Sequence, residues 1–201
     1  MSVSEVDTPH GPARVHVYPA ERQRAALVLG HGAGGGVEAP DLVAARNAAI
    51  AERVSVALVE QPYRVAGRRS PAPARQLDAA FVAIVEHLVT GELRDLPLVV
   101  GGRSLGGRVA CRTVAATGAV GVLCLAFPLQ PPRRSAESRL PELDAVPVPT
   151  FVVQGERDPF GIPPPGPRRK VVLVGGDHGL KADLEAVGTA VRGWLHGLLR
   201  T

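Results

Sequence analysis

One serine of the chain stands between glycines at a spacing that suits nucleophilic chemistry. Residues 102–106 read Gly-Arg-Ser-Leu-Gly, so a glycine lies two positions before and two positions after Ser104. A serine on a tight strand-to-helix turn can attack a carbonyl carbon, because the turn exposes its hydroxyl and the small neighbours let the chain reverse. The amide-rich start of the following helix favours the negative charge that develops in this attack. The pentapeptide therefore predicts a nucleophile.

An acid and a histidine follow the serine in an order that completes this chemistry. Asp158 and His178 each come shortly after a later apolar run. A histidine can take the proton of the serine as a general base, and a carboxylate can hold the imidazole in the correct tautomer. Glu156 is the reserve for the acid, whereas Asp177 is too close in sequence to His178 to orient its ring. The remaining histidines lie in less suitable places: His10, His16, His31, His87 and His196.

A glycine-rich loop after the first apolar run could stabilise the oxyanion of the same reaction. Residues 30–36 read Gly-His-Gly-Ala-Gly-Gly-Gly. An oxyanion hole takes one N–H from the residue after the nucleophile and one from such a loop. We therefore expect the N–H groups of Leu105 and Ala33, with Gly34 in reserve. The glycines also suit a sharp turn, and both roles are compatible.

The loop also fits a dinucleotide-binding pattern. Gly30, Gly32 and Gly35 have the GxGxxG spacing, and Glu60 ends the next predicted strand, where a ribose-binding acid would lie. This hypothesis leaves the serine, the acid and the histidine unexplained, and it ranks behind nucleophilic chemistry.

Short apolar runs alternate with helical patterns along the whole chain. Runs rich in valine and leucine predict buried parallel strands at residues 25–29, 54–59, 98–100, 120–127, 150–153 and 171–174. Residues 13–18 alternate polar and apolar side chains and predict an edge strand with one wet face. Helical patterns cover residues 42–50, 77–88 and 184–198. The alternation predicts an α/β fold with a mostly parallel, doubly wound sheet of about seven strands and helices on both faces.

This architecture would bring the three reactive residues together. Ligands bind beyond the carboxyl ends of parallel strands, and Ser104, Asp158 and His178 each follow a different predicted strand. Residues 127–150 leave no room for a helical cap, so we expect an open site. We expect one domain over residues 1–201, with residues 1–12 flexible.

Composition argues against several other classes of protein. The net charge of +4 comes almost wholly from scattered arginines, without a dense basic run, interleaved aromatic residues or zinc-type cysteine spacing, so we expect no nucleic-acid partner. Residues 119–127, the longest apolar run, are too few to span a bilayer, and residues 1–12 do not resemble a secretory signal. Cys111 and Cys124 predict buried free thiols, and the expected location is the cytoplasm.

Four motifs together resemble a known superfamily. They are His-Gly-Ala-Gly-Gly at residues 31–35, Pro-Tyr at 62–63 with Gly-Arg-Arg at 67–69, Gly-Arg-Ser-Leu-Gly-Gly-Arg at 102–108 and Gly-Asp-His at 176–178. The chain resembles the α/β-hydrolase superfamily from about residue 15 to residue 199. Within it the chain looks most like a compact, capless group that includes the testis-expressed and histone-acetyltransferase-complex-subunit types. Dienelactone-hydrolase-like esterases are the second resemblance.

The resemblance and the residues together predict a serine hydrolase that needs no metal or cofactor. It would cleave a small ester, as a carboxylesterase does, through an acyl-enzyme on Ser104. Some relatives serve as parts of larger complexes, so a hydrolase-fold binding module that has lost turnover is the alternative. The oligomeric state is left open.

Arginines at strand ends bear on the substrate. Seven fall at or just after predicted strands: Arg64, Arg68, Arg69, Arg103, Arg133, Arg134 and Arg157. They predict a basic rim that prefers a carboxylate or phosphate, with Tyr63, Arg64 and Arg103 as candidate substrate-binding residues. Alternatively, arginine is simply abundant throughout the chain, and Arg103 pairs with a buried acid such as Glu60 to brace the turn.

Overall fold

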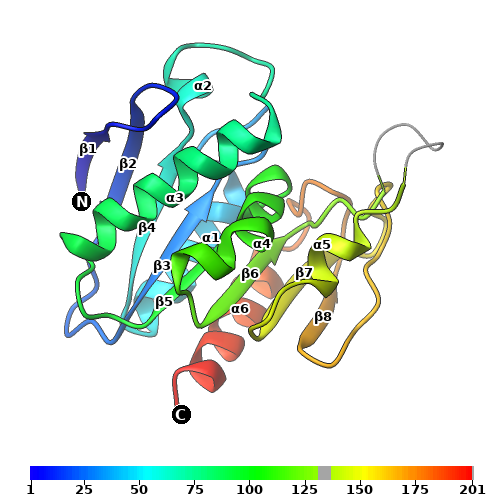
Figure 1. Cartoon of the computed structure of the whole chain (residues 1–201). Helices are drawn as coiled ribbons and strands as arrows, with labels where there is room; N and C mark the ends of the chain where they lie inside the picture. The colour runs from blue at the N-terminus through cyan, green and yellow to red at the C-terminus, as the bar shows by residue number, and fades with distance from the viewer. Residues whose placement is uncertain (131–136, 201) are drawn as a thin grey trace.

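Eight strands form one sheet in the computed structural model of the chain, which describes residues 1–130 and 137–200 (Figure 1). The strand order is β1-β2-β4-β3-β5-β6-β7-β8. Strands β3 to β8 run parallel to one another, whereas β2 is antiparallel to both β1 and β4. The strands are β1 Ser2–Val6, β2 Ala13–Tyr18, β3 Ala25–Gly30, β4 Val54–Glu60, β5 Leu98–Arg103, β6 Gly121–Leu125, β7 Thr150–Gly155 and β8 Arg169–Val174.

Helices cover both faces of the sheet. Helices α3, α4 and α5 lie on one face and α1 and α6 on the other (Figure 1). The helices are α1 Pro40–Ala51, α2 Pro62–Val65, α3 Ala74–Thr90, α4 Leu105–Thr117, α5 Leu140–Asp144 and α6 Leu184–Leu198. Both faces of the central strands are therefore buried, which is why their sequences are continuously apolar instead of alternating. This is the α/β-hydrolase fold that the sequence predicts.

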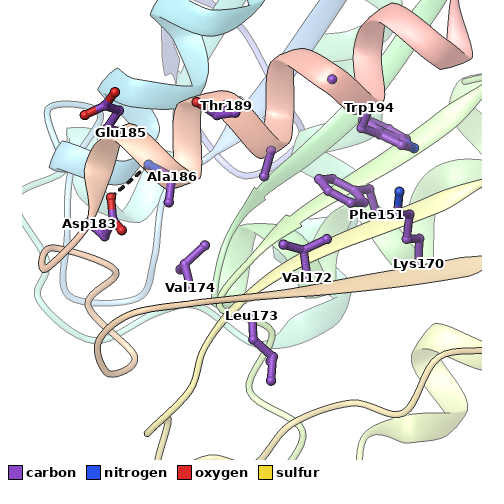
Figure 2. Close-up of a pocket in the computed structure, with 12 residues that line it drawn as sticks. Phe151, Lys170, Val172, Leu173, Val174, Asp183, Glu185, Ala186, Thr189 and Trp194 are labelled. Carbon is purple, nitrogen blue, oxygen red and sulfur yellow. Dashed lines mark hydrogen bonds between the residues drawn. The ribbon is translucent and has the colours of Figure 1, made fainter.

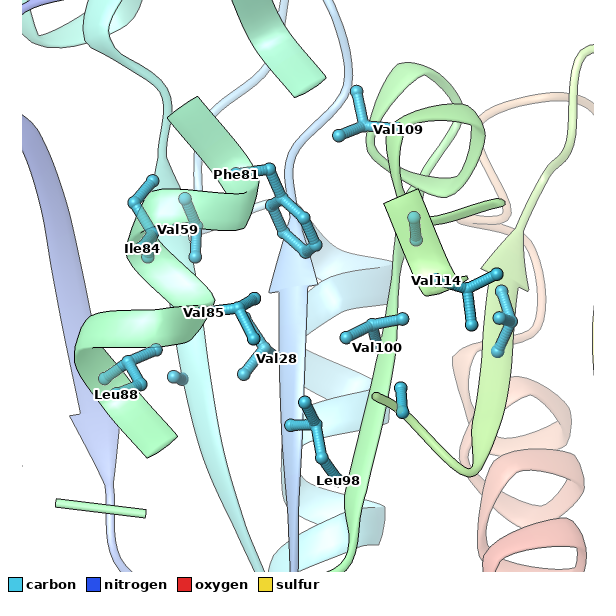
Figure 3. Packing of buried hydrophobic residues seen from close by; sticks show 14 of the residues in the cluster. Val28, Val59, Phe81, Ile84, Val85, Leu88, Leu98, Val100, Val109 and Val114 are labelled. Carbon is cyan, nitrogen blue, oxygen red and sulfur yellow. The ribbon is translucent and has the colours of Figure 1, made fainter. Parts of the chain in front are cut away.

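The apolar core is divided by the sheet into two layers. On the face covered by α3 and α4, Phe81 and Ile84 of α3 belong to one buried cluster with Val28, Val59 and Val100 of the central strands (Figure 3). On the opposite face, Phe151 stacks on Trp194 of α6 with ring centroids 5.4 Å apart. The central strands are thus fixed from both sides, and their carboxyl ends have well-defined positions.

The amino-terminal part differs from the sequence prediction. Residues 1–12 were expected to be flexible, but Ser2–Val6 form β1 and pair with β2 in antiparallel register from Ser2 opposite Val17 to Val6 opposite Ala13. Strand β2 is consequently not an edge strand, although its side chains alternate between buried and half-buried as predicted. The sheet therefore has eight strands rather than about seven.

The described connections above the carboxyl ends of the strands contain no cap domain. Between β6 and β7, the only helix that the described residues form is the five-residue α5. Among the described residues, no helix combines the length and hydropathy needed to cross a membrane.

Candidate active site

Ser104 occupies a sharp corner between β5 and α4. Its backbone has φ 50° and ψ −106°, a conformation that non-glycine residues rarely adopt, and α4 begins at the next residue. The corner is possible because two glycines surround it. A Cβ on Gly102 or on Gly106 would overlap the carbonyl oxygen of Gly30 in the neighbouring strand. The strained backbone thus holds the serine hydroxyl out at the carboxyl edge of the sheet.

A continuous chain of hydrogen bonds joins the three predicted residues. His178 Nε2 lies 3.0 Å from Ser104 Oγ, and His178 Nδ1 lies 2.8 Å from Asp158 Oδ2. The serine follows β5, the aspartate follows β7 and the histidine follows β8. Because a carboxylate oxygen only accepts, Nδ1 carries the proton and Nε2 is free to accept from the serine hydroxyl.

Asp158 is held rigidly behind the imidazole. Its side chain is fully buried and accepts hydrogen bonds from Gln154 Nε2 at 2.8 Å and from the Phe160 backbone N–H at 2.8 Å. The ring of Phe160 meets the His178 ring edge-on, with centroids 4.6 Å apart. The imidazole is therefore fixed by a carboxylate on one side and an aromatic ring on another.

The loop expected to form an oxyanion hole is braced by His31. His31 Nδ1 lies 2.7 Å from the Gly32 carbonyl oxygen, and Nε2 accepts the backbone N–H of Gln61 at 3.2 Å. Since Nε2 accepts, His31 is neutral and donates from Nδ1 to Gly32. Burial lowers the pKa of His31, which agrees with this neutral state. The Gly32 carbonyl shares a peptide plane with the N–H of Ala33, so His31 sets the orientation of that N–H.

Tyr63 braces the same loop from the next peptide. Its hydroxyl donates to the Ala33 carbonyl oxygen at 2.9 Å, its ring is buried, and burial raises the pKa of Tyr63 to about 12. Tyr63 and Arg64 are not among the described residues that line the cavity beside Ser104. Direct substrate contact by Tyr63 and Arg64 stays a prediction from the sequence.

Arg103 joins three parts of the site. Its Nε lies 2.9 Å from Oδ2 of the buried Asp41 in α1, and Nη2 donates to the His178 carbonyl oxygen at 3.2 Å. Burial raises the pKa of Asp41, and Arg103 opposes this rise. The alternative that Arg103 pairs with a buried acid is confirmed, but the acid is Asp41. Glu60, the example expected from the sequence, pairs instead with His16 at 2.7 Å and with Arg14 at 3.7 Å. The Glu60 carboxylate is therefore engaged away from the loop of the dinucleotide pattern.

A cavity of about 450 Å³ opens beside the serine. Ser104, Leu105, His178 and the loop residues Ala33 and Gly34 all line it. Its other described lining residues are Pro71, Arg103, Arg108, Pro128, Arg139 and Phe160. The reactive hydroxyl and both predicted oxyanion segments thus face one space.

The reserve acids and most rim arginines lie elsewhere. Glu156 and Asp177 are exposed and do not contact the His178 ring; Asp177 instead accepts the Gly179 N–H at 2.8 Å. Arg103 is the only predicted rim arginine in the described lining. Arg133 and Arg134 fall outside the described residues.

A larger groove of about 610 Å³ lies between β8 and α6 (Figure 2). Phe151, Val172 and Trp194 form its apolar floor, and its described lining includes none of Ser104, Asp158 and His178. Asp183 at one end caps α6 by accepting the Ala186 N–H at 2.9 Å.

Sequence reasoning missed several residues that shape the site. Gln154, His31 and Asp41 act through other residues, which are Asp158, Gly32 and Arg103 respectively. Gln154 could have been found from the sequence, because a polar side chain inside an otherwise apolar strand indicates a buried hydrogen-bonding role. Arg108 lies within α4, and Arg139 lies just before α5. Neither residue directly follows a strand, which is where the sequence predicts the site residues.

Comparison with known proteins agrees with this architecture. XC6422 from Xanthomonas campestris, described as an α/β serine hydrolase without lid, superposes with a TM-score of 0.81 at 17% identity, covering 100% of this chain and 95% of that one. Est1E from Butyrivibrio proteoclasticus gives 0.82 at 13% identity with 100% of both chains covered. Dienelactone hydrolase from Anabaena variabilis gives 0.79 at 15% identity, covering 99% and 98%. No curated protein matches the chain.

A family model for the alpha/beta hydrolase domain matches residues 23–189. That range holds β3 to β8 and the three residues joined by hydrogen bonds. The narrower resemblance to testis-expressed and histone-acetyltransferase-subunit types stays a prediction from the motifs. The chain belongs to the alpha/beta hydrolase domain family.

Proposed function

We propose that this protein is a serine hydrolase that cleaves small carboxylic esters. The observation that carries the proposal is the hydrogen-bonded chain from Asp158 through His178 to Ser104, with its 2.8 Å and 3.0 Å links. Each link has the length required for a base and its orienting acid. The absence of a cap among the described residues suits substrates that enter from open solvent.

Acylation follows from the direction of these hydrogen bonds. Ser104 Oγ attacks the ester carbonyl carbon while its proton passes to His178 Nε2, which forms a tetrahedral oxyanion and an imidazolium. Asp158 stabilises the imidazolium through Nδ1–H. The imidazolium then gives its proton to the ester oxygen, the carbon–oxygen bond breaks and the alcohol leaves, so that the acyl group remains on Ser104.

Deacylation repeats these steps with water. His178 Nε2 takes a proton from a water molecule as its oxygen attacks the acyl carbon, and the second tetrahedral intermediate forms. The proton returns to Ser104 Oγ as the carbon–oxygen bond to the serine breaks. The carboxylic acid leaves, and the serine and the neutral histidine are restored.

The oxyanion would bind at the backbone N–H groups of Leu105 and Ala33, with Gly34 in reserve. Leu105 is the first residue of α4, and the first N–H groups of a helix have no partner within it. The brace from His31 to the Gly32 carbonyl supports the choice of Ala33, because it fixes the peptide that carries this N–H. Such donors typically contribute a factor of about 10² to 10³ to kcat.

Hydrolysis of short neutral esters tests the proposal. The wild-type protein should hydrolyse ethyl butyrate, and Ser104→Ala and His178→Ala should each lower kcat by about 10³ or more. Ser4→Ala removes an exposed serine of β1 and serves as the matched control, with unchanged activity. A folded wild-type protein that hydrolyses no ester would favour the binding-module alternative instead.

A further inference from the structure

Three arginines line the cavity beside Ser104, although the described residues contribute no acid to its wall. Arg103, Arg108 and Arg139 come from β5, α4 and the segment before α5. The rest of the lining is mostly small or apolar. A positive charge that faces a largely apolar space is costly to leave without a partner, so the fate of each guanidinium matters.

Two of these arginines are already neutralised. Arg103 forms its ion pair with Asp41 at 2.9 Å. Arg108 binds Glu142 through two hydrogen bonds of 2.8 Å and 2.6 Å, the bidentate arrangement that best satisfies a guanidinium.

Arg139 differs from both. Its Nη1 donates to the Pro128 carbonyl oxygen at 3.1 Å, and no carboxylate of the described residues lies within ion-pair distance of it. The side chain is half-buried and stays protonated at neutral pH. Most of its donors therefore remain available to a molecule in the cavity.

The surrounding charges leave one cation in excess. Arg112 takes Asp78 in a bidentate pair at 2.8 Å and 2.6 Å and approaches Glu142 at 3.5 Å. Among the described residues, the ion pairs of Arg108 and Arg112 use the carboxylates of Asp78 and Glu142, and neither carboxylate pairs with Arg139. Burial and the neighbouring Arg108 lower the pKa of Arg139, as expected for a cation in an unfavourable field. An anion bound beside Arg139 would relieve this repulsion.

We propose that Arg139 forms an anion-binding subsite beside Ser104, so that the preferred esters carry a carboxylate. This inference rests on the proposed ester hydrolysis and names the substrate class of the same site. The planar guanidinium binds a carboxylate through paired N–H donors, which fixes the substrate relative to the serine. Arg103 is occupied by Asp41 and His178, and it shapes the wall without taking part in this recognition.

The test compares esters that differ only in charge. Ethyl hydrogen succinate and its neutral isostere ethyl succinamate place the difference on the acyl side, and the acetate esters of 4-hydroxybenzoate and 4-hydroxybenzamide place it on the alcohol side. For at least one pair, the wild type should prefer the anion by about 10-fold to 100-fold in kcat/KM, as expected for a charge-assisted hydrogen bond. The pair that shows the preference tells which side of the ester faces Arg139.

Variants then assign the preference to one side chain. Arg139→Gln should abolish it while leaving kcat/KM for the neutral esters within a few-fold, and Arg139→Lys should retain part of it because the charge remains without the planar fork. Arg75→Gln removes an equal charge from the exposed start of α3 and should change nothing. Equal rates for both members of each pair, or an undiminished preference in Arg139→Gln, would overturn the subsite.

A binding measurement separates this inference from the hydrolysis itself. Sodium glutarate should raise the melting temperature of the wild type and of Arg75→Gln more than sodium chloride of equal ionic strength, and it should not raise that of Arg139→Gln. If no ester is hydrolysed, the proposed function fails, and the glutarate shift decides the subsite alone. The absence of a shift in the wild type, together with equal ester rates, contradicts it.

Discussion

His178 makes two hydrogen bonds of fixed direction, and each has a different consequence. The bond to Asp158 keeps the proton on Nδ1, and the bond to Ser104 requires a free lone pair on Nε2. The acid therefore acts by selecting a tautomer and by stabilising the imidazolium. Gln154 and the Phe160 N–H keep the carboxylate in place for this task.

Asp158→Asn should separate tautomer control from folding. The asparagine side chain has one oxygen that accepts and one nitrogen that donates, so it cannot accept hydrogen bonds from His178 Nδ1, Gln154 and the Phe160 N–H together. We therefore expect kcat for ester hydrolysis to fall by about 10³ to 10⁴. The fold should persist, because the replacement has the same shape. Steady-state kinetics combined with a melting curve checks this, and a loss of less than tenfold in a folded variant would argue against the role of Asp158.

His31 should make the stability of the protein depend on pH. Burial lowers the pKa of His31 below the ordinary 6.5, so between these two pKa values the imidazole is protonated in the unfolded chain and neutral in the folded protein. The contribution of His31 is therefore complete above pH 6.5 and is lost as the pH falls toward the lower pKa of the folded state, by up to about 1.4 kcal/mol per pH unit. In His31→Gln, the decrease in unfolding free energy between pH 7 and pH 5 should be correspondingly smaller. Urea titrations at both pH values measure it, and identical pH dependence in the two proteins would contradict the assignment.

Individual residues were predictable where their neighbours in sequence define their role. The glycines around Ser104 and the position of His178 after an apolar run belong to this class. Gln154, His31 and Asp41 do not, because their roles depend on how the folded chain orients each side chain toward its partner. Tyr63 shows the difference directly: its place after a strand suggested substrate contact, but its hydroxyl is used by the Ala33 carbonyl.

At the scale of elements, the corner at Ser104 depends on how closely β3 and α4 approach each other. A Cβ on Gly30 would lie 3.2 Å from the Gly106 Cα, so the first turn of α4 rests directly on the neighbouring strand. This contact places the start of the helix, with its free N–H groups, beside the serine. The geometry of the site thus depends on two backbones without side chains between them.

Gly106→Ala should be among the most damaging single substitutions in the chain. The added methyl group would meet the Gly30 backbone, which cannot move without disturbing the sheet, so we expect a loss of about 4 kcal/mol or failure to fold. Gly193→Ala is the matched control. Its Cβ meets nothing within 4 Å on an exposed position of α6, and it should stabilise the protein by about 0.5–1 kcal/mol. Denaturant titrations of the two variants should show opposite signs, and similar small effects would contradict the close approach.

The parallel strands were readable from the sequence, whereas β1 was not. Strands covered on both faces must be apolar throughout, so β3 to β7 appear as runs of valine and leucine. Strand β1 has the sequence SVSEV, and four of its five residues are exposed. Its pairing depends on backbone hydrogen bonds to β2, which leave no apolar pattern.

At the scale of the whole molecule, Arg103 links parts of the chain that are far apart in sequence. It joins the end of β5 to Asp41 in α1 and to the loop that carries His178, and its Nη1 lies against Gly32 of the oxyanion loop. One side chain therefore couples the nucleophile, the base and the expected oxyanion loop. The sequence offered a buried acid as the partner of Arg103 but named Glu60 as the example, because the choice among acids is made by the packing of α1 on the sheet.

Breaking this link should affect stability and activity together. Arg103→Met leaves the buried Asp41 without its counter-ion, and we expect a loss of about 3–5 kcal/mol. Asp41→Leu combined with Arg103→Met removes both charges and should recover much of the stability without restoring full activity, because the contact to the His178 carbonyl stays lost. A double-mutant cycle in urea measures the coupling, and additive losses would show that the two side chains act independently.

The central claim is that Ser104 is a nucleophile activated by His178. It is tested most directly by treating the folded protein with a fluorophosphonate and locating the adduct by mass spectrometry. We predict one phosphonylated residue, Ser104, with no labelling in Ser104→Ala and strongly slowed labelling in His178→Ala. An adduct on another residue, or labelling of Ser104 at the same rate without His178, would contradict the claim.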